Sequence, residues 1–208
     1  MKDTYTFPFD TCEKPHKSGV AQPYSAAINT VNCLVILYFL VNAKSTHAFM
    51  FLLSIFLFEA MHTFSHIVHV PGKIQVSIVH ILAYCANFAL LWYAYKTSHR
   101  IPNGWFDVWY AALVGFDIYA FMNLSILIYL LTQSAMFIST LTYYYHDFPK
   151  ALREKMPWIL LFIGITIAFI VNESYHCKTM ATAYPNFPFH IFIELSGLVL
   201  FYLVSSSI

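Results

Sequence analysis

The segment from 105 to 145 reads WFDVWYAALVGFDIYAFMNLSILIYLLTQSAMFISTLTYYY, and its only formally charged side chains are Asp107 and Asp117. An α-helix rises about 1.5 Å per residue, so one helix of this length would be roughly twice as long as the hydrocarbon core of a bilayer is thick. The segment therefore predicts two membrane-spanning helices joined by a tight turn near Asn123.

The composition of the whole chain agrees with a membrane environment. Of its 208 residues, 59% are hydrophobic and 10% are charged, whereas a soluble domain carries roughly 25% charged residues. The formal net charge of +1 gives no basic surface for nucleic acid, so nucleic-acid binding is excluded as a function class.

Seven apolar segments of about twenty residues, the length that crosses a bilayer, are separated by turn-forming or charged residues. We predict an all-α integral membrane protein, a seven-transmembrane-helix bundle, in which a polar N-terminal tail (1–22) precedes a single membrane domain (23–208). The expected spans are 23–43, 47–70, 75–95, 105–122, 124–145, 156–173 and 187–206.

The distribution of basic residues predicts the orientation of the bundle. Lysine and arginine are more frequent in the loops near residues 44, 100 and 150 than in those near 72, 123 and 180. The positive-inside rule then places the N-terminus outside the cell or in a lumen. On that side Cys12 and Cys177 could form a disulfide if the compartment is oxidising, although free thiols are the commoner state of such cysteines.

Ionisable residues inside spans are costly, by about 2.5 kcal/mol or more near the bilayer centre, and are candidates for function. In the second span Glu59, His62, His66 and His69 are three or four residues apart, so they share one face of a helix. Alternating span directions bring further polar residues to the same face of the membrane. These are Asn29, His80, Asp117, Glu173, His176 and His190, with Glu194 one turn beyond His190.

Several imidazoles and carboxylates in a low-dielectric layer predict a divalent metal site, because neutral histidine and ionised carboxylate are metal ligands. Zinc with three protein ligands and one open position fits this set best. Two alternatives stay open for the individual residues. A single membrane histidine is often a hydrogen-bonding group between helices, and Glu59 could be protonated and bonded to a neighbouring helix.

Residues 65–69 read SHIVH, an SxxxH motif that resembles the one in alkaline ceramidases and the seven-helix hydrolase superfamily that includes adiponectin-receptor-type proteins. The resemblance implies zinc ligands at His69 and His190 and an oxyanion-binding role for Ser65. It also implies a calcium site with Asp10 and Glu13, although later positions of that site are Pro15 and Ala26 here. Other stretches similar to family motifs are DTCE (10–13), NTV (29–31), VNESYHC (171–177) and FPFHIF (187–192).

The chain departs from the family pattern at two positions. The family's seventh helix opens with HxxxH, and the first of these histidines is Asn186 here; an aspartate of the third helix is His80. His80 is the expected replacement as third zinc ligand. Glu194, His66 and His62 are alternative ligands, because Glu194 follows His190 by one helical turn and the other two share the face of His69.

The resemblance implies a zinc-dependent hydrolase that cleaves the amide of ceramide or a related membrane lipid, with Asp117 or Glu59 moving the proton to the leaving amine. The alternative is a non-catalytic receptor or lipid-binding protein of the same superfamily that keeps the metal. A metal or proton carrier is a third possibility, but few polar residues continue toward the opposite face of the membrane.

Overall fold

The computed structural model describes residues 6–7, 20, 22–68, 70–71, 73–98, 104–123, 126–184 and 187–208. Two strands of two residues each, β1 (Thr6–Phe7) and β2 (Val70–Pro71), pair antiparallel, and the rest of the regular structure in this part of the chain is helical. The α-helices are α1 (Pro23–Val41), α2 (Thr46–Ile67), α3 (Lys73–Thr97), α4 (Gly104–Asn123), α5 (Ile126–Tyr143), α6 (Lys150–Ala183) and α7 (Ile191–Ser205).

Helical structure is what an apolar chain requires in lipid, because a helix satisfies its backbone hydrogen bonds within one segment. Within the described part of the chain, four helices are long and apolar enough to cross a membrane: α1, α2, the Ser77–Thr97 part of α3, and α6. The Leu127–Tyr143 part of α5 and α7 are apolar but shorter. The helical fold class is therefore confirmed, and several of its helices could span a membrane.

The tight turn expected near Asn123 agrees with the structure, in which α4 ends at Asn123 and α5 begins at Ile126. The largest difference from the expected spans is α6. The sequence predicts a span over 156–173, whereas the helix has 34 residues, or about 50 Å at 1.5 Å per residue. The helix absorbs most of two predicted loops, because 150–155 and 177–183 contain no glycine or proline that would end it.

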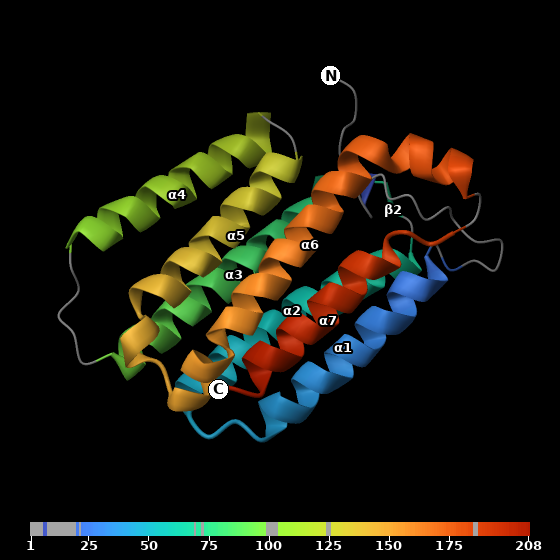
Figure 1. Ribbon diagram of the computed structural model, residues 1–208. Coiled ribbons are helices and arrows are strands. Elements are labelled where there is room, and N and C mark those ends of the chain that lie inside the picture. The colour runs from blue at the N-terminus through green and yellow to red at the C-terminus, as the bar shows by residue number, and fades with distance from the viewer. Residues whose placement is uncertain are drawn as a thin grey trace.

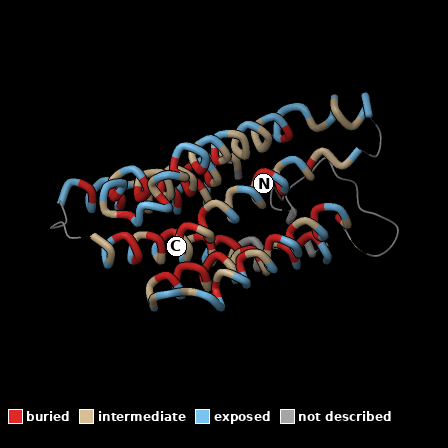
Figure 2. Tube along the Cα trace, turned by 60° about the horizontal axis from the view of Figure 1, so that its bottom comes forward, coloured by how far each residue is buried: buried red, intermediate tan, exposed pale blue. Residues whose placement is uncertain are grey.

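The helices pack as a ring with one helix outside it. Around the ring α1 contacts α2, α2 contacts α3, α3 contacts α5, α5 contacts α6, α6 contacts α7 and α7 contacts α1. The remaining helix, α4, packs mainly on α5 and lies at the edge of the molecule in Figure 1. Buried residues lie along the sides of the helices that face their neighbours, as Figure 2 shows.

Apolar and polar buried residues occupy opposite ends of the bundle. The main apolar core is built from the late residues of α1, α3 and α5 and the early residues of α2, α4 and α6, including Ile36, Leu52, Leu90 and Leu152. The other end, where α2 ends and α7 begins, contains the buried residues Asn29, Glu59, His66, Asp117, His190 and Glu194. The alternating direction of successive helices produces this separation.

Leu90→Ala should lower the free energy of unfolding by about 2–4 kcal/mol, because Leu90 is 0% exposed and its removal leaves a cavity in the apolar core. Leu34→Ala is the matched control: Leu34 is 61% exposed on the outer side of α1, so the change should cost less than about 0.5 kcal/mol. Unfolding of the purified protein in detergent measures both values. Equal losses in the two variants would contradict the inward orientation of Leu90.

The cysteines are in different states. Cys33 and Cys85 are free thiols, whereas Cys177 near the end of α6 is disulfide-bonded. The interpretation of all cysteines as free thiols is therefore wrong for Cys177. Cys12, its expected partner in an oxidising compartment, lies outside the described residues.

Candidate metal centre

The last turns of α2 carry three ionisable side chains on one face. Glu59, His62 and His66 are separated by three and four residues, which places them above one another on the helix. Glu59 and His66 are fully enclosed, whereas the side chain of His62 is 22% exposed. The two histidines face Glu194 in the first turn of α7.

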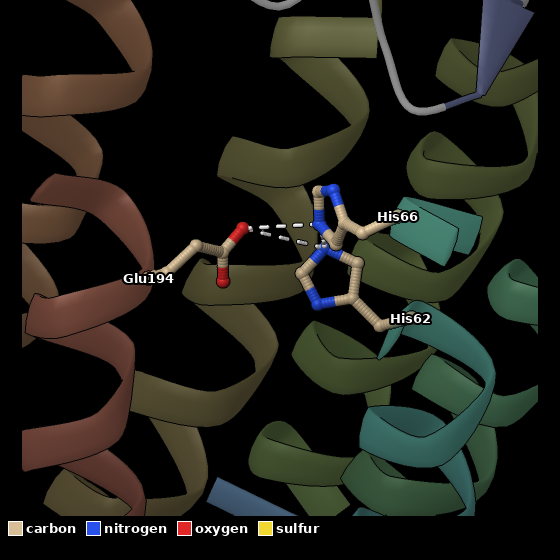
Figure 3. Close-up of side chains that lie close together, drawn as sticks. All are labelled: His62, His66 and Glu194. Atoms are coloured by element: carbon tan, nitrogen blue, oxygen red, sulfur yellow. Dashed lines mark hydrogen bonds and ion pairs between the residues drawn. The ribbon is translucent and has the colours of Figure 1, made fainter. Parts of the chain in front are cut away.

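Helix α7 supplies two more groups at its N-terminal end. His190 is the N-cap residue and Glu194 lies in the first turn. The carboxylate atom Glu194 Oε1 is 2.8 Å from His190 Nε2 and 3.1 Å from His66 Nε2. Figure 3 shows Glu194 reaching across from α7 toward the two histidines of α2.

The ligand atoms of His62, His66 and Glu194 converge on one point. The Nε2 atoms of the two histidines are 3.1 Å apart, and His62 Nε2 is 3.8 Å from Glu194 Oε1. One ligand atom from each of the three residues lies within 4.8 Å of the other two. The group could therefore hold a metal ion.

The opposite nitrogen of each imidazole faces an oxygen atom of a different residue. His190 Nδ1 is 2.7 Å from Glu173 Oε2, and His62 Nδ1 is 3.5 Å from both Glu59 Oε2 and the amide nitrogen of Asn29. His66 Nδ1 contacts the side-chain oxygen of Gln22. Partners of this kind hold the ring orientation and the Nδ1–H tautomer of histidines that bind metals through Nε2.

This arrangement has a direct chemical consequence. If His66 and His190 donate their Nδ1–H to Gln22 and Glu173, the Nε2 atoms of these two rings present lone pairs to the carboxylate of Glu194. Consistent with that, Glu194 Oε1 is buried and accepts no hydrogen bond of normal geometry from the described residues. Lone pairs that face one another without a donor favour a cation between them, so the donor set fits a divalent metal.

Gln22 connects the N-terminal end of α1 to this centre. Its backbone N–H donates to the carbonyl oxygen of His66 at 2.9 Å, and its side chain contacts the ring of the same residue. Sequence reasoning did not identify Gln22 as part of the site. The signal in the sequence was that Gln22 is a polar residue directly before Pro23, at the start of an apolar span. Polar residues are common at the ends of such spans, so this signal does not distinguish a site residue.

The expected site residues fall into four sets, of which the pair His80 and Asp117 is the last. The structure brings Glu59, His66, His190 and Glu194 together, with His62 and Glu173. Ser65 is buried, and its hydroxyl donates to the Met61 carbonyl oxygen of its own helix at 2.8 Å. The third set, which lies outside the described residues, comprises His69, Asp10 and Glu13.

His80 and Asp117 do not join this centre. His80 Nε2 is 3.9 Å from Asp117 Oδ2, and the carboxylate of Asp117 accepts hydrogen bonds from Tyr84 of α3 and Gln133 of α5. Asp117 therefore contacts groups of α3 and α5. The structure does not bring His80 and Asp117 into the group of His62, His66 and Glu194, and their expected roles beside His69, which lies outside the described residues, stay predictions.

Comparison with known proteins gives no assignment for this site. The chain matches no protein-family model, no curated protein and no solved structure.

Proposed function

We propose that the protein is a zinc-dependent hydrolase of the membrane that cleaves the amide of ceramide or a related lipid. The observation that carries the proposal is the convergence of His62, His66 and Glu194 at the end of a membrane-spanning helix. Two imidazoles and one glutamate are a ligand set of catalytic zinc sites, in which a further position remains for water. Histidines at i and i+4 on one helix are a frequent part of such sites.

The proposed frame is a bundle in which all seven helices cross the membrane. The shorter apolar helices α5 and α7 both pack against the long helix α6, so the three helices are neighbours in the ring. The metal centre then lies near the membrane face where α2 ends and α7 begins. The disulfide-bonded state of Cys177, toward the same end of α6, supports a lumenal or extracellular position for that face, because disulfides persist in oxidising compartments.

A bound zinc ion would supply Lewis acidity and activate water at neutral pH. Among the chain's own residues, Glu59 is the group that we assign to proton transfer, because it is buried beside His62 and its Oε1 atom has no hydrogen-bond partner among the described residues. Glu173 and Gln22 would orient His190 and His66 by accepting from their Nδ1 atoms.

The surroundings of the centre support a lipid substrate. His62 is its most exposed histidine, and the ring of Phe58 stacks beside it with centroids 6.0 Å apart. Phe58 and Met61 pack, together with Phe121, against the buried Val79, so the side chains next to His62 on this side are apolar. A reactant that approaches His62 would therefore need an apolar portion next to its polar group, as a ceramide has.

Metal analysis and a chelator experiment test the proposal. Purified protein is expected to contain about one zinc ion per chain, and to release fatty acid from ceramides labelled in the acyl chain. Pretreatment with 1,10-phenanthroline should abolish the release, and added zinc should restore it. Zinc-loaded protein that releases no fatty acid from several acyl-chain lengths would favour the non-catalytic receptor, and protein without metal would reject both.

A further inference from the structure

Helices α3, α4 and α5 enclose a second polar group, separate from the metal centre. Asp117 of α4 is 0% exposed. Its Oδ2 atom accepts hydrogen bonds from the Tyr84 hydroxyl at 2.6 Å and from Gln133 Nε2 at 2.9 Å. The amide of Asn87 extends the group by donating to Gln133 Oε1 at 2.7 Å. Four side chains from three helices thus form one continuous hydrogen-bonded group.

Two buried oxygen atoms of this group are without a donor. Asp117 Oδ1 and Asn87 Oδ1 have no hydrogen-bond partner among the described residues. They belong to side chains that are held on the two sides of the same Gln133 amide, since Gln133 accepts from Asn87 and donates to Asp117. A buried acceptor that is left unpaired destabilises the fold, and it does so more strongly when it is charged.

Asp117 also has no close counterion among the described residues. Its one ion-pair contact in the described part of the chain is His80, whose Nε2 atom is 3.9 Å away. That contact is longer than a hydrogen bond and is made to Oδ2, the oxygen that already accepts two. The imidazole itself is surrounded by aromatic rings, with centroids 3.9 Å from Phe121 and 4.7 Å from Tyr129. Asp117 Oδ1 is therefore a buried oxygen atom without a hydrogen-bond donor or a counterion among the described residues.

We propose that this group is a binding site for a monovalent alkali cation, with Asp117 Oδ1 and Asn87 Oδ1 as ligand atoms. Carboxylate and amide oxygens are ligands for hard cations, whereas the imidazole-rich centre between α2 and α7 suits a transition metal. A single carboxylate is neutralised by one positive charge, and a divalent ion would leave a net charge in the low-dielectric interior. The cation would tie α4, the helix outside the ring, to α3 and α5.

Thermal unfolding of the purified full-length protein in detergent tests the site. The midpoint Tm is measured in NaCl, KCl and choline chloride at equal ionic strength. Sodium or potassium should raise Tm by at least about 2 °C over choline, and the rise should saturate with concentration. Equal Tm values in all three salts would overturn the proposal.

Variants locate the effect. Asp117→Asn and Asn87→Ala should each remove the difference between sodium and choline, and Asn87→Ala keeps the carboxylate in case Asp117→Asn does not fold. Asn172→Ala is the control, because Asn172 is exposed on α6, and it should keep the full response. A response that persists in both Asp117→Asn and Asn87→Ala would place the cation elsewhere and reject the site. The two sites share no ligand, so chelation of zinc should leave the sodium response unchanged.

Discussion

His66→Ala is expected to lower the zinc affinity of the purified protein by more than about 100-fold. Loss of a residue that only hydrogen-bonds a metal ligand lowers metal affinity by about 10- to 100-fold, and His66→Ala removes a ligand atom itself. Among the three ligand residues, His66 has the position most firmly fixed by its contacts. It is fully buried, its Nε2 atom is 3.1 Å from both His62 Nε2 and Glu194 Oε1, and its other nitrogen contacts Gln22. Zinc content after dialysis, together with fatty acid release from ceramide, measures the loss.

Two variants keep this test decisive. Glu194→Gln preserves side-chain shape but removes the charged ligand, so it should also lose zinc even if His66→Ala is poorly folded. His176→Ala changes an exposed histidine of α6 and should keep wild-type zinc content. If His66→Ala and Glu194→Gln both retained one zinc ion per chain, the ligand assignment would be wrong.

Glu173→Gln is expected to weaken zinc binding by about 10- to 100-fold without removing a ligand atom. Glu173 Oε2 lies 2.7 Å from His190 Nδ1, and a neutral amide holds that proton less strongly than a carboxylate. The loss of charge should therefore leave the His190 ring less well oriented, and with it Glu194, the ligand whose Oε1 atom lies 2.8 Å from His190 Nε2. Competition for zinc with a chelator of known affinity measures the change.

Glu154→Gln is the matched control for this prediction. Glu154 lies on the same helix and pairs with Lys150 at 3.6 Å, but both side chains are more than half exposed. Zinc affinity in this variant should equal that of the wild type. Glu173→Gln protein with the same affinity as Glu154→Gln protein would show that Glu173 does not act on the metal.

Much of the helical architecture was predictable because the physical signal is local. Apolar stretches long enough for a bilayer are interrupted by Pro71-Gly72-Lys73 and by Ser98 to Gly104, and the observed helices end at or near these places. The prediction was poorest for α6, where no helix-breaking residue marks the end of the apolar segment. Helical turns that continue beyond the apolar region leave no hydropathy signal.

The site was predictable only in part. The spacing of Glu59, His62 and His66 is a property of one helix, and so is the spacing of His190 and Glu194. Which of these pairs meet, and whether His80 and Asp117 join them, depends on the order of helices around the bundle. Hydropathy contains no information on that order. The sequence predicts only which residues lie at a similar depth in the membrane, not which helices are neighbours.

The sequence by itself determined that this chain is helical and apolar enough for a membrane, and that the ionisable residues expected inside its spans lie toward one end of the helices. The tertiary structure alone decided how they divide. With α4 outside the ring, Asp117 meets groups of α3 and α5, whereas Glu194 of α7 meets the histidines of α2. The physical reason is that helix periodicity and depth act within one segment, whereas the neighbours of a segment are chosen by side-chain packing between helices.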